Sequence, residues 1–144
     1  MAIFTTAFGK VHVGEPPELL AEATRIGIGA WEAAGHGHFS WALTGGSTPV
    51  AWYRRYGIRA AWPQELPAET HWFASDERCV PLTSEESNFG NAAHLLLDPL
   101  GVPVNRRHPW PVGLPPEAAA AAFTKDCDRI LGPGRGFTLC FLGL

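Results

Sequence analysis

The segment that most constrains the fold is a short apolar run that leads straight into a glycine-rich turn. Residues 39–43 (Phe-Ser-Trp-Ala-Leu) indicate a buried strand, and residues 44–49 (Thr-Gly-Gly-Ser-Thr-Pro) follow without a break. The next stretch, residues 50–56, favours a helix. A strand, a glycine turn and a helix in this order are typical of an α/β protein with parallel strands.

The same alternation continues along the rest of the chain. Further strands are predicted at 70–75 and 137–142, and residues 2–13 have a β-rich pattern. Further helices, with proline or glycine near their ends, are predicted at 16–34, from a Ser87 or Asn88 cap to 97, and at 115–130. This order predicts a mostly parallel, Rossmann-like three-layer α/β sheet, in which ligands bind beyond the carboxyl ends of the strands.

Composition excludes several classes of protein. The chain has 144 residues, of which 46% are hydrophobic, and a formal charge of -3. This apolar fraction excludes disorder and predicts a single domain over residues 1–144, while the mild negative charge argues against a nucleic-acid partner. Because no apolar run approaches about 20 residues and no signal-peptide pattern is present, we expect no membrane partner and a cytoplasmic location.

The glycine turn is the first candidate for binding chemistry. Gly45 and Gly46 let the backbone approach a ligand closely, Ser47 and Thr48 add hydroxyl groups, and a helix is expected to begin at Pro49. Such a turn is an anion cradle, most plausibly for phosphate; the alternative is an ordinary turn capped by serine or threonine. The lysine of a nucleotide P-loop and the third glycine of a dinucleotide fingerprint are absent, so no such cofactor is expected.

The second candidate is the polar loop after the strand at 70–75. It reads Ser-Asp-Glu-Arg-Cys-Val-Pro over residues 75–81, with Ser87 and Asn88 following. Asp76 and Glu77 supply carboxylates for acid–base chemistry, and Arg78 supplies a fork for an anion; the alternative is a solvated charged turn. Because this loop and the glycine turn follow different strands of one predicted sheet, they should lie at the same edge of it.

The histidines and cysteines give weaker signals. His36 and His38 are spaced for one side of a strand, but no third ligand accompanies them, so no metal site is expected. His71 and His94 are interpreted as packing or surface residues, and His108 is expected to open a strand at the sheet end opposite the functional edge. The three cysteines lack C-x-x-C spacing, which predicts neither a disulfide framework nor a zinc site. Tryptophans at positions 31, 41, 52 and 72 are predicted to be packing residues.

Three segments together resemble a known family. ALTGGSTP (42–49), SDERCVP (75–81) and SNFG (87–90), in this order and at about this interval, resemble the 6-phosphogluconolactonase family. That family shares its sheet architecture with glucosamine-6-phosphate deaminases. HPWP (108–111) and FTLCFLGL (137–144) fall where the family has its next strands. In the deaminases an aromatic residue usually stands where this chain has Arg78, which favours the lactonase branch.

The resemblance implies a reaction and a set of site residues. The reaction is hydrolysis of 6-phosphogluconolactone to 6-phosphogluconate, in the pentose phosphate pathway. The implied partner is therefore a phosphorylated sugar lactone or sugar phosphate, and no cofactor is implied. The implied site consists of Asp76 near the reacting ring carbons, Arg78 at the anionic end of the substrate, Asn88 as a residue that shapes the pocket, and Gly45, Gly46, Ser47 and Thr48 along the sugar-phosphate site.

The resemblance also implies that the water-activating base is missing. In the family, the strand that matches residues 137–142 leads into a D-G-H-T-A-S turn whose histidine is that base, and this sequence stops at Leu144, just before it. We therefore expect the N-terminal portion of such a domain, weakly active by itself. Two alternatives are a non-catalytic sugar-phosphate binder and a deaminase or isomerase with Asp76 as the proton-shuttling base. The apolar last strand predicts self-association or a missing C-terminal segment.

Overall fold

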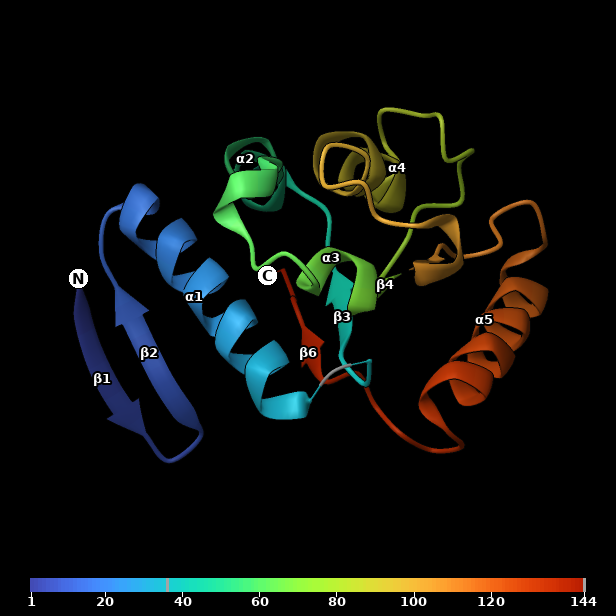
Figure 1. Ribbon diagram of the computed structural model, residues 1–144. Helices are drawn as coiled ribbons and strands as arrows, with labels where there is room; N and C mark the ends of the chain where they lie inside the picture. Colours follow the sequence, from blue (N-terminus) through green and yellow to red (C-terminus); the bar gives the residue numbers. More distant parts are fainter. Residues whose placement is uncertain (36, 144) are drawn as a thin grey trace.

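The computed structural model describes residues 1–35 and 37–143 (Figure 1). Its elements in chain order are β1 (Ala2–Thr6), β2 (Gly9–Val13), α1 (Pro16–Ala34), β3 (Ser40–Leu43), α2 (Ser47–Tyr56), η1 (Arg59–Ala61), α3 (Leu66–Glu69), β4 (His71–Ala74), α4 (Asn88–Ala92), η2 (Ala93–Leu97), η3 (Val104–Arg106), β5 (Arg107–His108), α5 (Pro116–Leu131) and β6 (Leu139–Cys140). The central sheet has the strand order β5-β4-β3-β6, and each neighbouring pair is parallel. The predicted parallel α/β sheet is therefore confirmed.

Side chains of the central strands alternate between two apolar layers. Trp41 and Trp72 point to one face of the sheet and pack in the larger cluster with residues of α1, α2 and η2. Ala42 and Phe73 point to the other face and pack against Phe123 of α5. Figure 1 shows α1 and α5 on opposite sides of the sheet. Helices cover both faces, as the near-continuous apolar strands predict.

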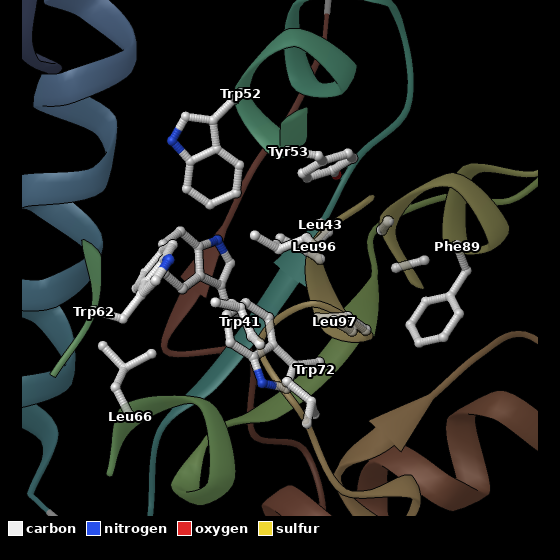
Figure 2. Packing of buried hydrophobic residues seen from close by; sticks show 14 of the residues in the cluster. Trp41, Leu43, Trp52, Tyr53, Trp62, Leu66, Trp72, Phe89, Leu96 and Leu97 are labelled. Carbon is white, nitrogen blue, oxygen red and sulfur yellow. The ribbon is translucent and has the colours of Figure 1, made fainter. Parts of the chain in front are cut away.

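Trp41 of β3 is the centre of the larger cluster. Its ring stacks on Trp72 of the neighbouring strand, with centroids 5.4 Å apart and an interplanar angle of 17°. Trp52 of α2 and Trp62 lie 5.5 and 6.0 Å from it, an arrangement that Figure 2 shows from close by. Aromatic pairs at these spacings stabilise a core by about 0.5–1.5 kcal/mol each beyond their buried area. The interpretation of these tryptophans as packing residues is confirmed, and Trp31 of α1 is buried in the same cluster.

The N-terminal β-rich segment forms a separate hairpin. β1 and β2 pair antiparallel with each other, and Figure 1 shows them on the outer side of α1. The hairpin contacts α1 through an ion pair from the Met1 amino group to Glu18 and through His12 Nδ1, which lies 3.3 Å from Glu22 Oε1. A two-stranded hairpin is marginal by itself, so these contacts to α1 contribute to holding it.

The last strand is shorter than the sequence predicts. Only Leu139 and Cys140 have strand geometry within the expected range 137–142. Just before them, the Thr138 N–H donates to Ser40 Oγ at 2.9 Å and the Ser40 N–H to Thr138 Oγ1 at 3.3 Å, so side-chain bonds replace the backbone ladder. Within the described part of the chain, β6 pairs with β3 alone. Self-association, or a further segment that covers β6, stays a prediction. The molecular mass found by sedimentation would test self-association.

The helix predicted through residue 97 changes its geometry partway. α4 ends at Ala92, and the chain continues directly as η2, a π-helix over Ala93–Leu97. The predicted helix is confirmed through residue 97, and its second half has π geometry, because a regular apolar spacing does not reveal an extra residue in a turn. The predicted Ser87 cap is confirmed, since Ser87 Oγ accepts a hydrogen bond from the Gly90 N–H.

No helix in residues 1–35 and 37–143 is long and apolar enough to cross a membrane. The three cysteines are free thiols, Cys79 and Cys140 being exposed and Cys127 partly exposed.

Two histidines pack side by side at the start of β4 and the end of β5. Arg106 Nη1 donates to His71 Nε2 at 2.6 Å, because a guanidinium can only donate. His71 Nδ1 must then carry the proton of its 2.9 Å hydrogen bond to His108 Nε2. Burial, reinforced by neighbouring cations, lowers the pKa of both rings, and that of His108 falls to about 4. Both rings are therefore neutral packing groups, as predicted for His71. His108 is the last residue of β5, so its expected place at the start of a strand, opposite the functional edge, is wrong.

This pair predicts a pH-dependent stability. The unfolded chain binds a proton at His108 below its ordinary pKa of 6.5, whereas the folded chain does so only near 4. The contribution is fully present above pH 6.5 and is lost as the pH falls towards 4. We expect urea unfolding to give a free energy about 1 kcal/mol lower at pH 5 than at pH 7, since solvent screens the half-exposed ring.

The matched control is a histidine outside this pair. The His108→Gln variant should lose most of the pH dependence, whereas His94→Gln, at an exposed position of η2, should keep it. The same pH dependence in wild type and His108→Gln would show that the pair does not titrate as described.

Candidate functional site

The carboxyl ends of β3 and β4 bring both candidate loops to one place. Leu43 and Ala74, the last residues of the two strands, are register partners, and the Ser75 N–H donates to the Leu43 carbonyl at 2.7 Å. One residue further on, Thr44 Oγ1 donates to Asp76 Oδ1 at 3.2 Å. The expectation that the glycine turn and the polar loop share one edge of the sheet is therefore confirmed.

The glycine turn enters its helix earlier than predicted. α2 begins at Ser47, with Gly46 as N-cap, so the expected start at Pro49 is wrong. Gly46 has φ 107°, a conformation that L side chains rarely adopt, and it turns the chain directly into the helix. The alternative of a serine or threonine cap is also wrong, because no side chain caps α2. The N–H groups of Ser47 and Thr48 precede the first helical bond, from the Val50 N–H to the Gly46 carbonyl.

Asp76 is held by hydrogen bonds from three side chains. Thr44 Oγ1 and Ser75 Oγ each donate to its Oδ1 atom at 3.2 Å. Asn88 Nδ2 donates to its Oδ2 atom at 3.1 Å and to its backbone carbonyl at 3.2 Å. A carboxylate has about four acceptor positions, so these bonds orient the group and leave room for about one more donor.

The close approach of Asn88 explains one of the two glycines. A Cβ atom at Gly45 would lie 1.7 Å from Asn88 Oδ1 and 2.3 Å from its Cγ. Any larger residue at position 45 would therefore push this buried amide away from Asp76. Gly45 is required by space and Gly46 by backbone conformation, so the pair has two different physical causes.

Glu77, next to Asp76, accepts hydrogen bonds from the protein itself. Its Oε1 atom accepts from the backbone N–H groups of Arg78 and Asn88 at 2.8 and 2.7 Å. Its Oε2 atom accepts from the Phe89 N–H and the Ser87 hydroxyl at 2.9 and 3.0 Å. The Glu77 carboxylate thus caps the start of α4. Glu77 and Asp76 therefore have different roles, although the sequence alone suggests one pair of acid–base carboxylates.

Two adjoining cavities open at this edge of the sheet. One, of about 460 Å³, is lined by Thr44, Gly45, Gly46, Ser75, Asp76, Arg78, Asn88, Leu142 and Gly143. The other, of about 730 Å³, shares Gly46, Arg78 and Asn88 with it and adds Ser47, Glu77 and Cys79, with Glu85 and Glu86 among the remaining lining residues. Six of the seven predicted site residues therefore surround this pair of cavities.

Thr48 is the predicted site residue that lies elsewhere. It lines a third, apolar cavity of about 580 Å³ with Leu19, Trp52 and Phe141. Helical geometry turns its side chain away from Ser47, although its backbone N–H stays in the first turn of α2. The side-chain role assigned to Thr48 therefore has no support from this arrangement.

Sequence reasoning missed Thr44, Ser75 and Tyr53. Thr44 and Ser75 directly follow the strands, and a hydroxyl residue at that place was an available signal. The buried Tyr53 hydroxyl donates to the Thr44 carbonyl at 2.6 Å and so holds the start of the glycine turn in place. Burial raises the pKa of Tyr53, so this hydroxyl stays a donor. Its spacing in α2 looks like ordinary packing and gave no signal.

Metal chemistry has no candidate ligands in the described ranges. No group of three or more histidine, cysteine, aspartate or glutamate side chains there could hold a metal ion. His36, one of the two histidines considered as ligands, lies outside the described residues, and His38 is exposed. None of the residues that line the 460 Å³ cavity in this part of the chain is a histidine.

Comparison with known proteins gives consistent results. Residues 16–144 match the family model described as glucosamine-6-phosphate isomerases/6-phosphogluconolactonase. A 6-phosphogluconolactonase of Treponema pallidum is 34% identical over 111 residues, which cover 72% of this chain and 44% of that protein. One of Mycobacterium leprae is 31% identical over 131 residues, covering 87% and 50%.

The solved structures agree with these sequences. A 6-phosphogluconolactonase from Trypanosoma cruzi superposes with a TM-score of 0.71 and 27% identity, covering 88% of this chain and 52% of that one. The chain spans about half the length of these lactonase relatives or less, and 12% of a rabbit (Oryctolagus cuniculus) GDH/6PGL endoplasmic bifunctional protein, which is 40% identical over 106 residues.

The contact between Gly45 and Asn88 yields a prediction. We expect Gly45→Ala to lower the free energy of unfolding by about 1–3 kcal/mol, because the new methyl group displaces a buried, hydrogen-bonded amide. Gly29→Ala is the matched control, since a Cβ atom at Gly29 would meet nothing within 4 Å. This exposed glycine inside α1 should gain about 0.5–1 kcal/mol on substitution. Equal effects of the two substitutions in urea unfolding would contradict the crowding at Gly45.

Proposed function

Because the chain belongs to the glucosamine-6-phosphate isomerase/6-phosphogluconolactonase family, we propose that it provides the sugar-phosphate-binding part of a 6-phosphogluconolactonase. Its substrate is then a phosphorylated six-membered sugar lactone, which hydrolysis opens to 6-phosphogluconate. The observation that carries the proposal is that Asp76, Arg78 and residues 44–46 of the glycine turn surround one cavity at the carboxyl ends of β3 and β4. We propose that residues 1–144 form the N-terminal portion of the lactonase domain.

The phosphate is assigned to the junction of the two cavities. Gly46 and Arg78 line both of them, so a cation and the N-terminal end of α2 face the same space. An arginine fork binds phosphate in two-pronged geometry, and the N–H groups and dipole at a helix N-terminus favour negative charge. Glu85 and Glu86 line the outer cavity and repel an anion there, which favours the junction over the outer space.

The sugar ring is assigned to the cavity beside Asp76. Three donors already hold this carboxylate, and its remaining acceptor position suits a sugar hydroxyl near the reacting carbons. Asp76 then orients the lactone through a hydrogen bond. Because three donors already hold its carboxylate, Asp76 is a poor candidate for the proton-shuttling base of a deaminase. The relatives named 6-phosphogluconolactonase also favour the lactonase.

Lactone opening needs a base for the attacking water and donors for the developing oxyanion. The residues described at the 460 Å³ cavity supply binding groups and no histidine. A general base contributes about 10²–10⁴-fold to such a reaction. Residues 1–144 are therefore proposed to bind the product 6-phosphogluconate and to hydrolyse the lactone slowly.

Calorimetric titration with 6-phosphogluconate tests this proposal. We expect binding by the wild-type chain, and a loss of roughly 10–100-fold in affinity for Arg78→Ala because a charge-assisted contact to phosphate disappears. Arg54→Ala removes the same charge from the exposed far end of α2 and should leave the affinity within about twofold.

Three results would contradict the proposal. They are no binding by the folded wild-type chain, equal losses in the two arginine variants, and turnover of glucosamine 6-phosphate, which would favour the deaminase. A 6-phosphogluconolactone assay on a chain of verified mass completes the test. Hydrolysis as fast as that of a full-length lactonase would overturn the proposal that residues 1–144 hydrolyse the lactone only slowly.

A further inference from the structure

Each backbone N–H group at the start of α4 has a hydrogen-bond partner. In any helix the first of these groups find no partner within the helix itself. Here Glu77 accepts from Asn88 and Phe89, Ser87 Oγ accepts from the Gly90 N–H at 2.9 Å, and the Ser87 carbonyl accepts from Asn91 at 3.1 Å. One carboxylate on the loop after β4 therefore fixes the first turn of a helix that begins eleven residues later in the chain.

The same turn carries the amide that holds Asp76. Asn88 is bound to Glu77 through its backbone N–H, and to Asp76 through its side-chain Nδ2. The asparagine is 7% exposed, and its oxygen is confined by the close approach of Gly45. A shift of its backbone therefore moves the amide away from the aspartate, since the side chain has little free space to compensate.

We propose that Glu77 is a positioning residue for the sugar site, acting on Asp76 through Asn88. This inference rests on the proposed function, because it assigns Asp76 to the bound sugar. The two carboxylates then have different roles. Asp76 presents its remaining acceptor position to the ligand. Glu77 accepts hydrogen bonds from four protein donors and so keeps Asn88 in position.

The chemistry of the contacts requires a carboxylate at position 77. Its two oxygens face backbone N–H groups from both sides, and both oxygens must therefore accept. In Glu77→Gln, one of the two positions becomes an NH₂ group that faces other donors. At least one hydrogen bond from a backbone N–H group is lost at that position, and the start of α4 moves away from the loop.

A double-mutant cycle on 6-phosphogluconate affinity tests this coupling. We expect Glu77→Gln and Asn88→Ala each to weaken binding about tenfold, the scale of one hydrogen bond to a charged group. The double variant should also be only about tenfold weaker than wild type, because Glu77 acts through the residue already removed. A double variant about 100-fold weaker would mean independent effects and would overturn the proposal.

Two further variants separate positioning from charge and from misfolding. Glu32→Gln makes the same chemical change at an exposed position of α1 and should leave the affinity within about twofold. Glu77→Asp keeps the charge with a shorter reach and replaces Glu77→Gln in the cycle if the glutamine variant does not fold. We expect its loss to be smaller and again absent in the Asn88→Ala background.

A measurement without ligand distinguishes failure of this inference from failure of the proposed function. The NMR signals of the Asn88 side-chain NH₂ group should shift in Glu77→Gln and stay in place in Glu32→Gln. Unchanged Asn88 signals would overturn the positioning role by themselves. If the wild-type chain does not bind 6-phosphogluconate but the Asn88 signals shift, the proposed function fails while the link from Glu77 to Asn88 is supported.

Discussion

The in-register parallel pairing of β3 with β4 is the constraint on which the rest of this structure depends. Stacking of Trp41 on Trp72 in the core fixes the two strands relative to each other, so that Leu43 and Ala74 end at the same level. A slip of β4 by one residue along β3 would turn Trp72 to the opposite face of the sheet, away from Trp41. It would also separate Thr44 from Asp76. The aromatic core and the polar edge are thus consequences of one register.

Two neighbouring acids at this edge show how environment decides role. Asp76 is exposed at the cavity, and Glu77 is half-buried against the start of α4. The chain bends at Ser75 and Asp76 after the end of β4, and the Asp76 carboxylate lines the inner cavity while that of Glu77 binds the start of α4. The glycine turn has a similar division, since Ser47 lines the outer cavity and Thr48 faces the apolar one.

Much of the fold follows from the sequence, whereas the internal connections of the site do not. The parallel sheet and the shared edge of its loops were predictable, because apolar runs and glycine turns are local signals. The start of α2 at Ser47 and the short β6 were not, since they depend on the conformation of Gly46 and on bonds between Ser40 and Thr138. The cap by Glu77 joins residues ten or more positions apart, which no local pattern reports.

The central claim is that the edge formed by β3 and β4 binds a sugar phosphate. The most direct test is an NMR titration of the isotopically labelled chain with 6-phosphogluconate, followed through backbone amides and the Arg78 side chain. We expect shifts at Ser47, Arg78 and Asn88, and none at His71 or His108, which line a separate cavity against α5. Shifts confined to the histidine pair, or no shifts at saturating ligand, would contradict it.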